Sequence, residues 1–135
     1  VSLTVLRRSE KKALIYVCRL SSLERDLKKP GVANFIKKYG YESTDPAYAL
    51  ERLRSRLAQR EDFPHEIGLF LGYPLGDVKG FIEHHGKEYL CSGYWKVYQD
   101  EQKAKSTFQL YQSVRDAVLQ LIMAGSNLYE ISYQA

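Results

Sequence analysis

Residues 63–98 read FPHEIGLFLGYPLGDVKGFIEHHGKEYLCSGYWKVY, and a change of pattern inside this stretch decides the fold class. The first part places Pro64 and Pro74 where helices open, with apolar residues three and four positions apart behind them. The second part, from Glu88 to Tyr98, is aromatic and β-branched around Ser92-Gly93, which is typical of a strand with a bend or bulge. Helical and extended patterns therefore occur in separate blocks.

The flanking sequence extends this arrangement. Two β-rich runs at 2–6 and 13–18 predict an N-terminal hairpin, and helices are expected to begin at Ser21 or Ser22, near residue 32, and at the Asp45-Pro46 cap. The longest helix is expected from the cap Asp100 to Gly125. It carries apolar residues at helical spacing: Ala104, Phe108, Tyr111, Val114, Val118, Leu121 and Ile122.

The C-terminal alternation of Tyr129, Ile131 and Tyr133 predicts a short last strand or a frayed tail. Taken together, these patterns predict an α+β fold. We expect one small, mainly antiparallel sheet, made of the N-terminal hairpin and the strand near residues 88–98, covered by about six helices. The length of 135 residues fits a single domain, 1–135.

The composition excludes several classes of protein. No apolar run approaches the roughly 20 residues of a membrane span, so no membrane association is expected. The first residues lack the stages of a secretory signal, and two distant cysteines, Cys18 and Cys91, make no disulfide framework. A cytoplasmic location is therefore predicted. The chain begins at Val1 without a methionine, which indicates a processed or trimmed N-terminus.

The charge is uneven along the chain. Residues 1–60 carry 14 Lys/Arg against 6 Asp/Glu, and residues 61–135 carry 6 against 10. Such asymmetry either marks a basic face for nucleic acid or lets the two halves attract each other within the fold, and we favour the second interpretation. Arg52, Arg56 and Arg60 repeat every four residues, which indicates a solvated helix face or, alternatively, a contact to phosphate or RNA.

Candidate functional residues concentrate in 63–98. His65 and Glu66 lie near a predicted helix N-terminus, where a neutral imidazole can act as base or ligand. Tyr94 and Lys96 share one face of the predicted strand, and aromatic rings beside a cation suit a planar or anionic ligand. With Tyr73, these residues form the predicted ligand-binding set. Cys91 is a candidate thiol if His65 folds beside it.

Other patterns in this region indicate structure rather than chemistry. Residues 67–82 have the spacing of a helix-turn-helix, but the exposed positions of the second helix offer one lysine beside Asp77, too little to read DNA. Two helices packed through glycine explain the spacing better. His84 and His85 precede Gly86 at a helix end, where capping is favoured. No spacing matches a metal site, and no metal is predicted.

The blocks FPHEIGLFLGYPLGDVKGFIE at 63–83, GYWKVY at 93–98 and ALIYVCRLSSLERDL at 13–27 resemble a family of uncharacterised bacterial proteins known as a domain of unknown function. The resemblance covers nearly the whole chain and implies a shared fold but no activity or cofactor. Members often begin with a Cys-Ala-Pro-Thr segment, which this chain lacks, and have a cysteine where this chain has Val114. If those thiols carry chemistry, this protein lacks it.

These observations favour a module that binds a small molecule or a protein partner around His65, Glu66, Tyr73, Tyr94 and Lys96. An enzyme, a hydrolase or transferase using His65 with Glu66 or Cys91, is the alternative from another class. Nucleic-acid binding through the basic N-terminal half is a third, disfavoured alternative. The sequence identifies no cofactor.

Overall fold

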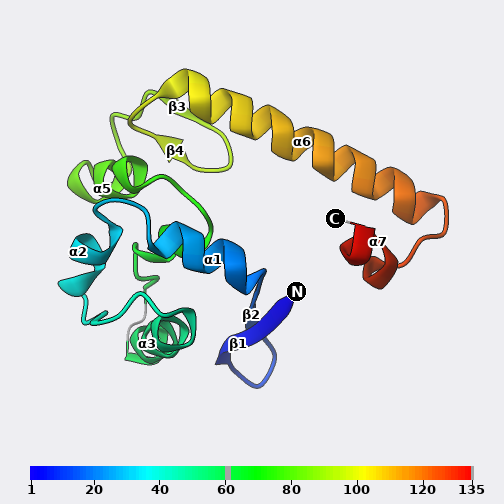
Figure 1. The fold of residues 1–135 in the computed structure, drawn as a ribbon. Coiled ribbons are helices and arrows are strands. Elements are labelled where there is room, and N and C mark those ends of the chain that lie inside the picture. Colours follow the sequence, from blue (N-terminus) through cyan, green and yellow to red (C-terminus); the bar gives the residue numbers. More distant parts are fainter. Residues whose placement is uncertain (60–61, 135) are drawn as a thin grey trace.

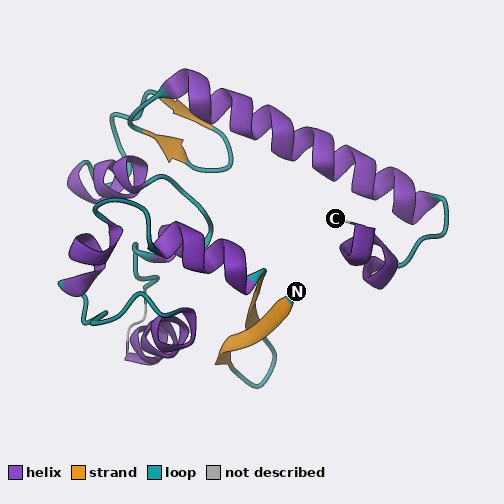
Figure 2. Ribbon diagram, viewed as in Figure 1, coloured by secondary structure: helices purple, strands orange, loops and turns teal. Residues whose placement is uncertain are grey.

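The computed structural model describes residues 1–59 and 62–134, and it confirms the α+β class (Figures 1 and 2). The first half contains β1 (Ser2–Arg8), β2 (Ala13–Cys18), α1 (Leu20–Leu27), α2 (Val32–Lys37) and α3 (Pro46–Gln59). The second half contains α4 (Ile67–Phe70), α5 (Leu75–Glu83), β3 (Cys91–Ser92), β4 (Lys96–Val97), α6 (Glu101–Met123) and α7 (Leu128–Gln134).

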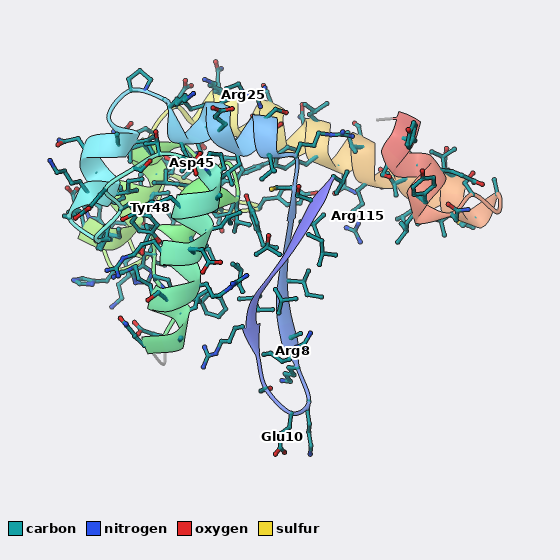
Figure 3. All side chains as sticks on the ribbon, turned by 60° about the horizontal axis from the view of Figure 1, so that its bottom comes forward. Arg8, Glu10, Arg25, Asp45, Tyr48 and Arg115 are labelled. Carbon is teal, nitrogen blue, oxygen red and sulfur yellow. The ribbon has the colours of Figure 1, made fainter. Side chains whose placement is uncertain are left out.

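The prediction of one sheet is wrong, because the two hairpins form separate two-stranded antiparallel sheets. The predicted single strand near residues 88–98 is also wrong: the chain turns back between β3 and β4, and the Gly93 N–H donates to the Trp95 carbonyl at 3.0 Å within this turn. The β1–β2 hairpin projects from the body with Arg8 and Glu10 near its tip (Figure 3). The β3–β4 hairpin lies at the other end of the body, beside the start of α6 (Figure 1). Just after β4, the backbone N–H groups of Tyr98 and Gln99 donate to the carboxylate of Asp77, so they are not available to another strand.

The predicted last strand is also wrong, since residues 128–134 form the helix α7. Asn127 Oδ1 accepts from the Glu130 N–H at 2.9 Å, and Glu130 Oε2 accepts from the Asn127 N–H at 3.2 Å. This reciprocal pair is a capping box, which the Asn-x-x-Glu spacing could have revealed. Tyr129 and Tyr133 instead lie four positions apart on one helix face, where their rings contact each other with centroids 5.6 Å apart.

Caps or prolines mark the starts of α3, α5 and α6. Asp100 caps α6 by accepting from the Lys103 N–H, as predicted. Pro74 precedes the first residue of α5, and Pro46 is the first residue of α3. The predicted serine caps of α1 are wrong, because this helix already begins at Leu20, after Arg19.

The hydrophobic core has two parts. The larger part joins the inner face of β1–β2 to helices α1 to α5 and contains Leu27, Ile36, Leu53 and Leu57, all fully buried. The smaller part holds Trp95, Val97 and Ala104, with Cys91 and Phe108 packed against it. Tyr73 packs against both parts. The C-terminal elements are therefore attached to the body through a small apolar contact area. Polar contacts at this junction should contribute a large share of its stability.

Candidate functional site

A pocket of about 370 Å³ lies where α4 and α5 meet the β3–β4 hairpin. The segment before α4, the helix α5 and the hairpin each supply a wall. The lining side chains are mainly aromatic or aliphatic, with a few polar groups among them: Phe63, Pro64, His65, Ile67, Tyr73, Asp77, Val78, Phe81, Tyr94, Trp95 and Lys96. Apolar walls with a few convergent polar groups are typical of small-molecule sites.

Aromatic rings form most of the pocket wall. Tyr73 stacks on Trp95 with centroids 4.9 Å apart and an interplanar angle of 29°. His65 packs on Phe81 with centroids 5.2 Å apart. Burial raises the pKa of Tyr73, with Tyr111 adding a smaller effect in the same direction, so the Tyr73 hydroxyl stays protonated; it donates to the Tyr94 carbonyl at 3.4 Å. The pocket therefore presents flat apolar faces with polar edges.

Lys96 brings a cation to this aromatic wall. Its Nζ donates to the Gly86 carbonyl at 2.8 Å and lies 5.8 Å from the Phe81 ring centroid and 5.1 Å from that of Tyr89. An ammonium group has three donors, and this is the single Lys96 Nζ hydrogen bond among the described residues. The remaining donors are available to a ligand. The exposed His65 ring, which also lines the pocket and packs on Phe81, makes no hydrogen bond within the described ranges.

Asp77 holds the hairpin wall in place. The side chain is 2% exposed, and its Oδ2 accepts from Trp95 Nε1 at 2.8 Å. Its Oδ1 accepts from the backbone N–H groups of Tyr98 at 2.8 Å and Gln99 at 3.0 Å. The helix-turn-helix spacing placed Asp77 at an exposed position, so its role in holding the hairpin was not predicted. An acidic residue in the first turn of a helix is a signal for such a role, but it does not identify the partners.

Gly80 allows the hairpin to approach α5. A methyl group at this position would overlap Cβ and the ring of Tyr98, which is fixed by its backbone bond to Asp77, by stacking on His84 and by donating its hydroxyl to the Lys87 carbonyl. At Gly76, one turn earlier, the overlap would be with the end of the exposed Gln99 side chain, which can move away.

We therefore expect opposite effects from the same substitution at these two glycines. Gly80→Ala should lower the free energy of unfolding by about 1 to 2 kcal/mol, because overpacking outweighs the gain in helix propensity. Gly76→Ala should be neutral or stabilising by up to about 1 kcal/mol. Urea denaturation of both variants measures the difference, and equal gains in stability would show that Tyr98 does not pack tightly on α5.

Glu66 does not line the pocket, in contrast to the other four residues of the predicted binding set. Its carboxylate is 1% exposed and bound to the body: Arg56 Nε donates to Oε1, Arg56 Nη2 donates to Oε2 at 3.3 Å, and the Tyr41 hydroxyl donates to Oε1 at 3.2 Å. Burial and the nearby Glu66 carboxylate raise the pKa of Tyr41. Glu66 is therefore a structural residue in this arrangement.

Cys91 also stays outside the pocket. It packs with Trp95, Val97 and Ala104 at the start of α6, and it is a free cysteine. Among the described residues, no hydrogen bond joins His65 to Glu66 or to Cys91. The groups proposed for an enzyme therefore do not converge.

The arginine repeat on α3 is not the solvated face that the spacing predicted. Arg52 donates through Nε and Nη2 to the Tyr39 carbonyl at 3.0 and 2.9 Å, and Arg56 is bound to Glu66. Arg60, the third member, lies outside the described residues. Two of the three cations are used within the fold, which weakens the case for a phosphate or RNA contact on this face.

The helix-turn-helix spacing at 67–82 corresponds to helices packed through glycine. An added Cβ at Gly68 would lie 3.0 Å from Val78 Cγ2, which shows how closely α4 approaches α5. The hairpin residues Tyr98 and Gln99 cover the glycine face of α5. This face is therefore not free to enter a DNA groove.

In the described part of the chain, no cluster of three or more His, Cys, Asp or Glu residues could hold a metal ion. His84 instead stacks on Tyr98 and contacts Glu88, with Nδ1 and Oε2 3.0 Å apart. No described helix combines the length and the hydropathy of a membrane span.

Comparison with known proteins gives one match. A family model described as "Protein of unknown function (DUF3793)" matches residues 1–132. No curated protein and no solved structure matches the chain significantly.

Proposed function

The chain belongs to the DUF3793 family of proteins of unknown function, and from the geometry of its pocket we propose that it binds a small planar, anionic ligand. The observation that carries this proposal is the ammonium group of Lys96 on an aromatic wall that the exposed imidazole of His65 also lines. The family identity confirms the resemblance carried by blocks 63–83 and 93–98, but it assigns no activity.

The size and shape of the pocket support a planar ligand. A volume of about 370 Å³ lies at the lower end of the range for small-molecule sites. The stacked pair Tyr73–Trp95 and the His65–Phe81 pair supply flat faces on which an aromatic ring system can pack.

The charge distribution supports an anion. Lys96 has spare donors, whereas the Asp77 carboxylate, which also lines the pocket, is buried and already accepts hydrogen bonds from three N–H groups. A hydrogen bond between an ammonium and an anionic ligand contributes about 1.5 to 3 kcal/mol, so Lys96 should dominate the recognition of the anionic group.

The proposal includes a single domain and a cytoplasmic location. Two free cysteines, Cys18 and Cys91, support a reducing compartment. Catalysis has less support than binding, because Glu66 is bound to Arg56 and Tyr41, and Cys91 lies outside the pocket that His65 lines.

Probe pairs that differ only in charge test the proposal. Flavin mononucleotide and riboflavin share one ring system, as do AMP and adenosine. We expect an anionic probe at 100 times its dissociation constant to raise the melting temperature by about ten degrees. It should also quench the fluorescence of Trp95, the only tryptophan, which lines the pocket.

The variant Lys96→Met separates charge recognition from ring stacking. It should weaken binding of the anionic probe by about 10- to 150-fold and leave binding of its neutral counterpart unchanged. Lys87→Met, an exposed lysine outside the pocket, is the matched control and should bind like the original protein. If neither anionic probe shifts the melting temperature or the Trp95 emission, the proposed ligand class is wrong.

A further inference from the structure

Helix α6 exposes an apolar face that the described structure covers only at its start, where the Tyr111 ring contacts those of Tyr94 and Trp95. Beyond its first turns the helix extends away from the body (Figure 1), and Ala104 is its one buried residue. Apolar residues nevertheless repeat at intervals of three and four at Tyr111, Val114, Val118 and Leu121. This is the spacing of a helix that packs against a second helix. We call these four residues, with their neighbours Leu110 and Ile122, the α6 stripe.

The α6 stripe is well exposed. Tyr111, Val114, Leu121, Leu110 and Ile122 are between 38% and 61% exposed. Helix α7 adds Leu128, Tyr129 and Tyr133, all at least 70% exposed. Arg19 Nη2 donates to the Ser132 carbonyl at 3.2 Å, which ties α7 to the N-terminal body.

The exposed area is large enough for a stable interface. On the usual areas of these side chains, α6 and α7 expose apolar surface on the order of 1,000 Å² per copy, compared with roughly 800 Å² per partner in a standard protein interface. A monomer that left such a surface in water would be prone to aggregate.

The charge of this region indicates the chemistry of the partner. Residues 106–129 contain one cation and one anion, Arg115 and Asp116, and are otherwise uncharged. Helices that lie on anionic lipid carry many Lys and Arg residues on the polar face, and nucleic-acid-binding faces are strongly basic. The α6 stripe therefore fits an uncharged, apolar helix of another protein.

We propose that the α6 stripe pairs with the α6 stripe of a second copy of this chain, with α7 flanking the contact. Because each copy carries the same apolar spacing on α6, each can supply one helix of such a pair. Residues 106–129 carry almost no charge, so two identical faces do not repel each other. A two-fold dimer uses the same patch on both subunits, and it is the commonest assembly of soluble proteins. This inference is independent of the pocket.

The test is the mass of the protein in solution, measured by sedimentation equilibrium between about 1 and 100 µM, the range over which interfaces of this size begin to form. The full chain should sediment at about twice its 15.6 kDa mass. Val114→Glu places a carboxylate in the middle of the α6 stripe and should weaken association by about 100-fold or more, because the charge would be buried without a partner. Since Val114 is 54% exposed in one copy, this variant should keep its circular dichroism spectrum.

Gln109→Glu is the matched control, because it adds the same charge on α6 at an exposed position with no member of the α6 stripe three or four residues away, and should leave the dimer intact. A monomer across the whole concentration range overturns the proposal, and binding of that monomer to neutral phosphatidylcholine vesicles would indicate that lipid covers the α6 stripe instead. A dimer equally stable in Val114→Glu and Gln109→Glu also overturns it, since the interface would then lie elsewhere.

Discussion

Replacing Arg56 by methionine is expected to lower the free energy of unfolding by about 3 to 5 kcal/mol, because it leaves the Glu66 carboxylate buried without a cation. The Arg56 side chain is 12% exposed and that of Glu66 is 1% exposed, so water screens the pair poorly. Arg56 also lies over the Tyr39 ring, 4.9 Å from its centroid, and methionine would keep part of that packing. Urea denaturation at neutral pH measures the loss.

Two comparisons isolate the buried charge as the cause. Arg25→Met removes an arginine that is 72% exposed and lies on the outer surface of α1 (Figure 3), and should change the stability by less than about 1 kcal/mol. Adding Glu66→Gln to Arg56→Met should restore part of the loss, since glutamine is uncharged and its oxygen still accepts from the Tyr41 hydroxyl. A loss below about 1 kcal/mol in Arg56→Met would show that the ion pair behaves as a surface pair.

Asp77→Asn should be the second most damaging change, with an expected loss of about 3 kcal/mol. Asparagine keeps the shape but loses the charge, and its NH₂ group cannot accept, so either Trp95 Nε1 or the backbone donors of Tyr98 and Gln99 lose their acceptor. Because Trp95 is the only tryptophan, its emission reports directly on this junction. We expect a shift to longer wavelength as the hairpin loosens and Trp95 contacts water.

A control on α6 separates this effect from a general loss of negative charge. Asp116→Asn changes an exposed carboxylate whose described hydrogen bond comes from Gln112, and should alter stability by less than about 0.5 kcal/mol. An unchanged Trp95 emission in Asp77→Asn, together with full stability, would mean that the hairpin is held by ring packing alone. The pocket proposal would then lose its explanation for the fixed position of Tyr94 and Lys96.

Local patterns in the sequence predicted the individual elements well. The cap Asp100, the helix breaks at prolines and the α+β class need only residues within a few positions of each other. The alternation of side chains along 94–98 is equally local. It placed Trp95 and Val97 on the inner face of the predicted strand, and both side chains are buried. The same alternation placed Tyr94 and Lys96 together on the other face. With His65 and Tyr73 from the preceding segment, they make four predicted residues that line one pocket.

The sequence by itself thus determined most of the helices, the N-terminal hairpin and the neighbourhood of the pocket, because propensity, capping and side-chain period act over a single turn or strand. It did not predict the turn between β3 and β4 or the helix α7. The tertiary structure alone decided which partner each charged or apolar group meets. Glu66 meets Arg56 across ten positions and Asp77 meets Trp95 across eighteen. Whether the apolar face of α6 is covered depends on which element packs against it. Such contacts form between elements whose relative positions no local pattern encodes, and they decide that Glu66 is structural and that the α6 stripe is exposed.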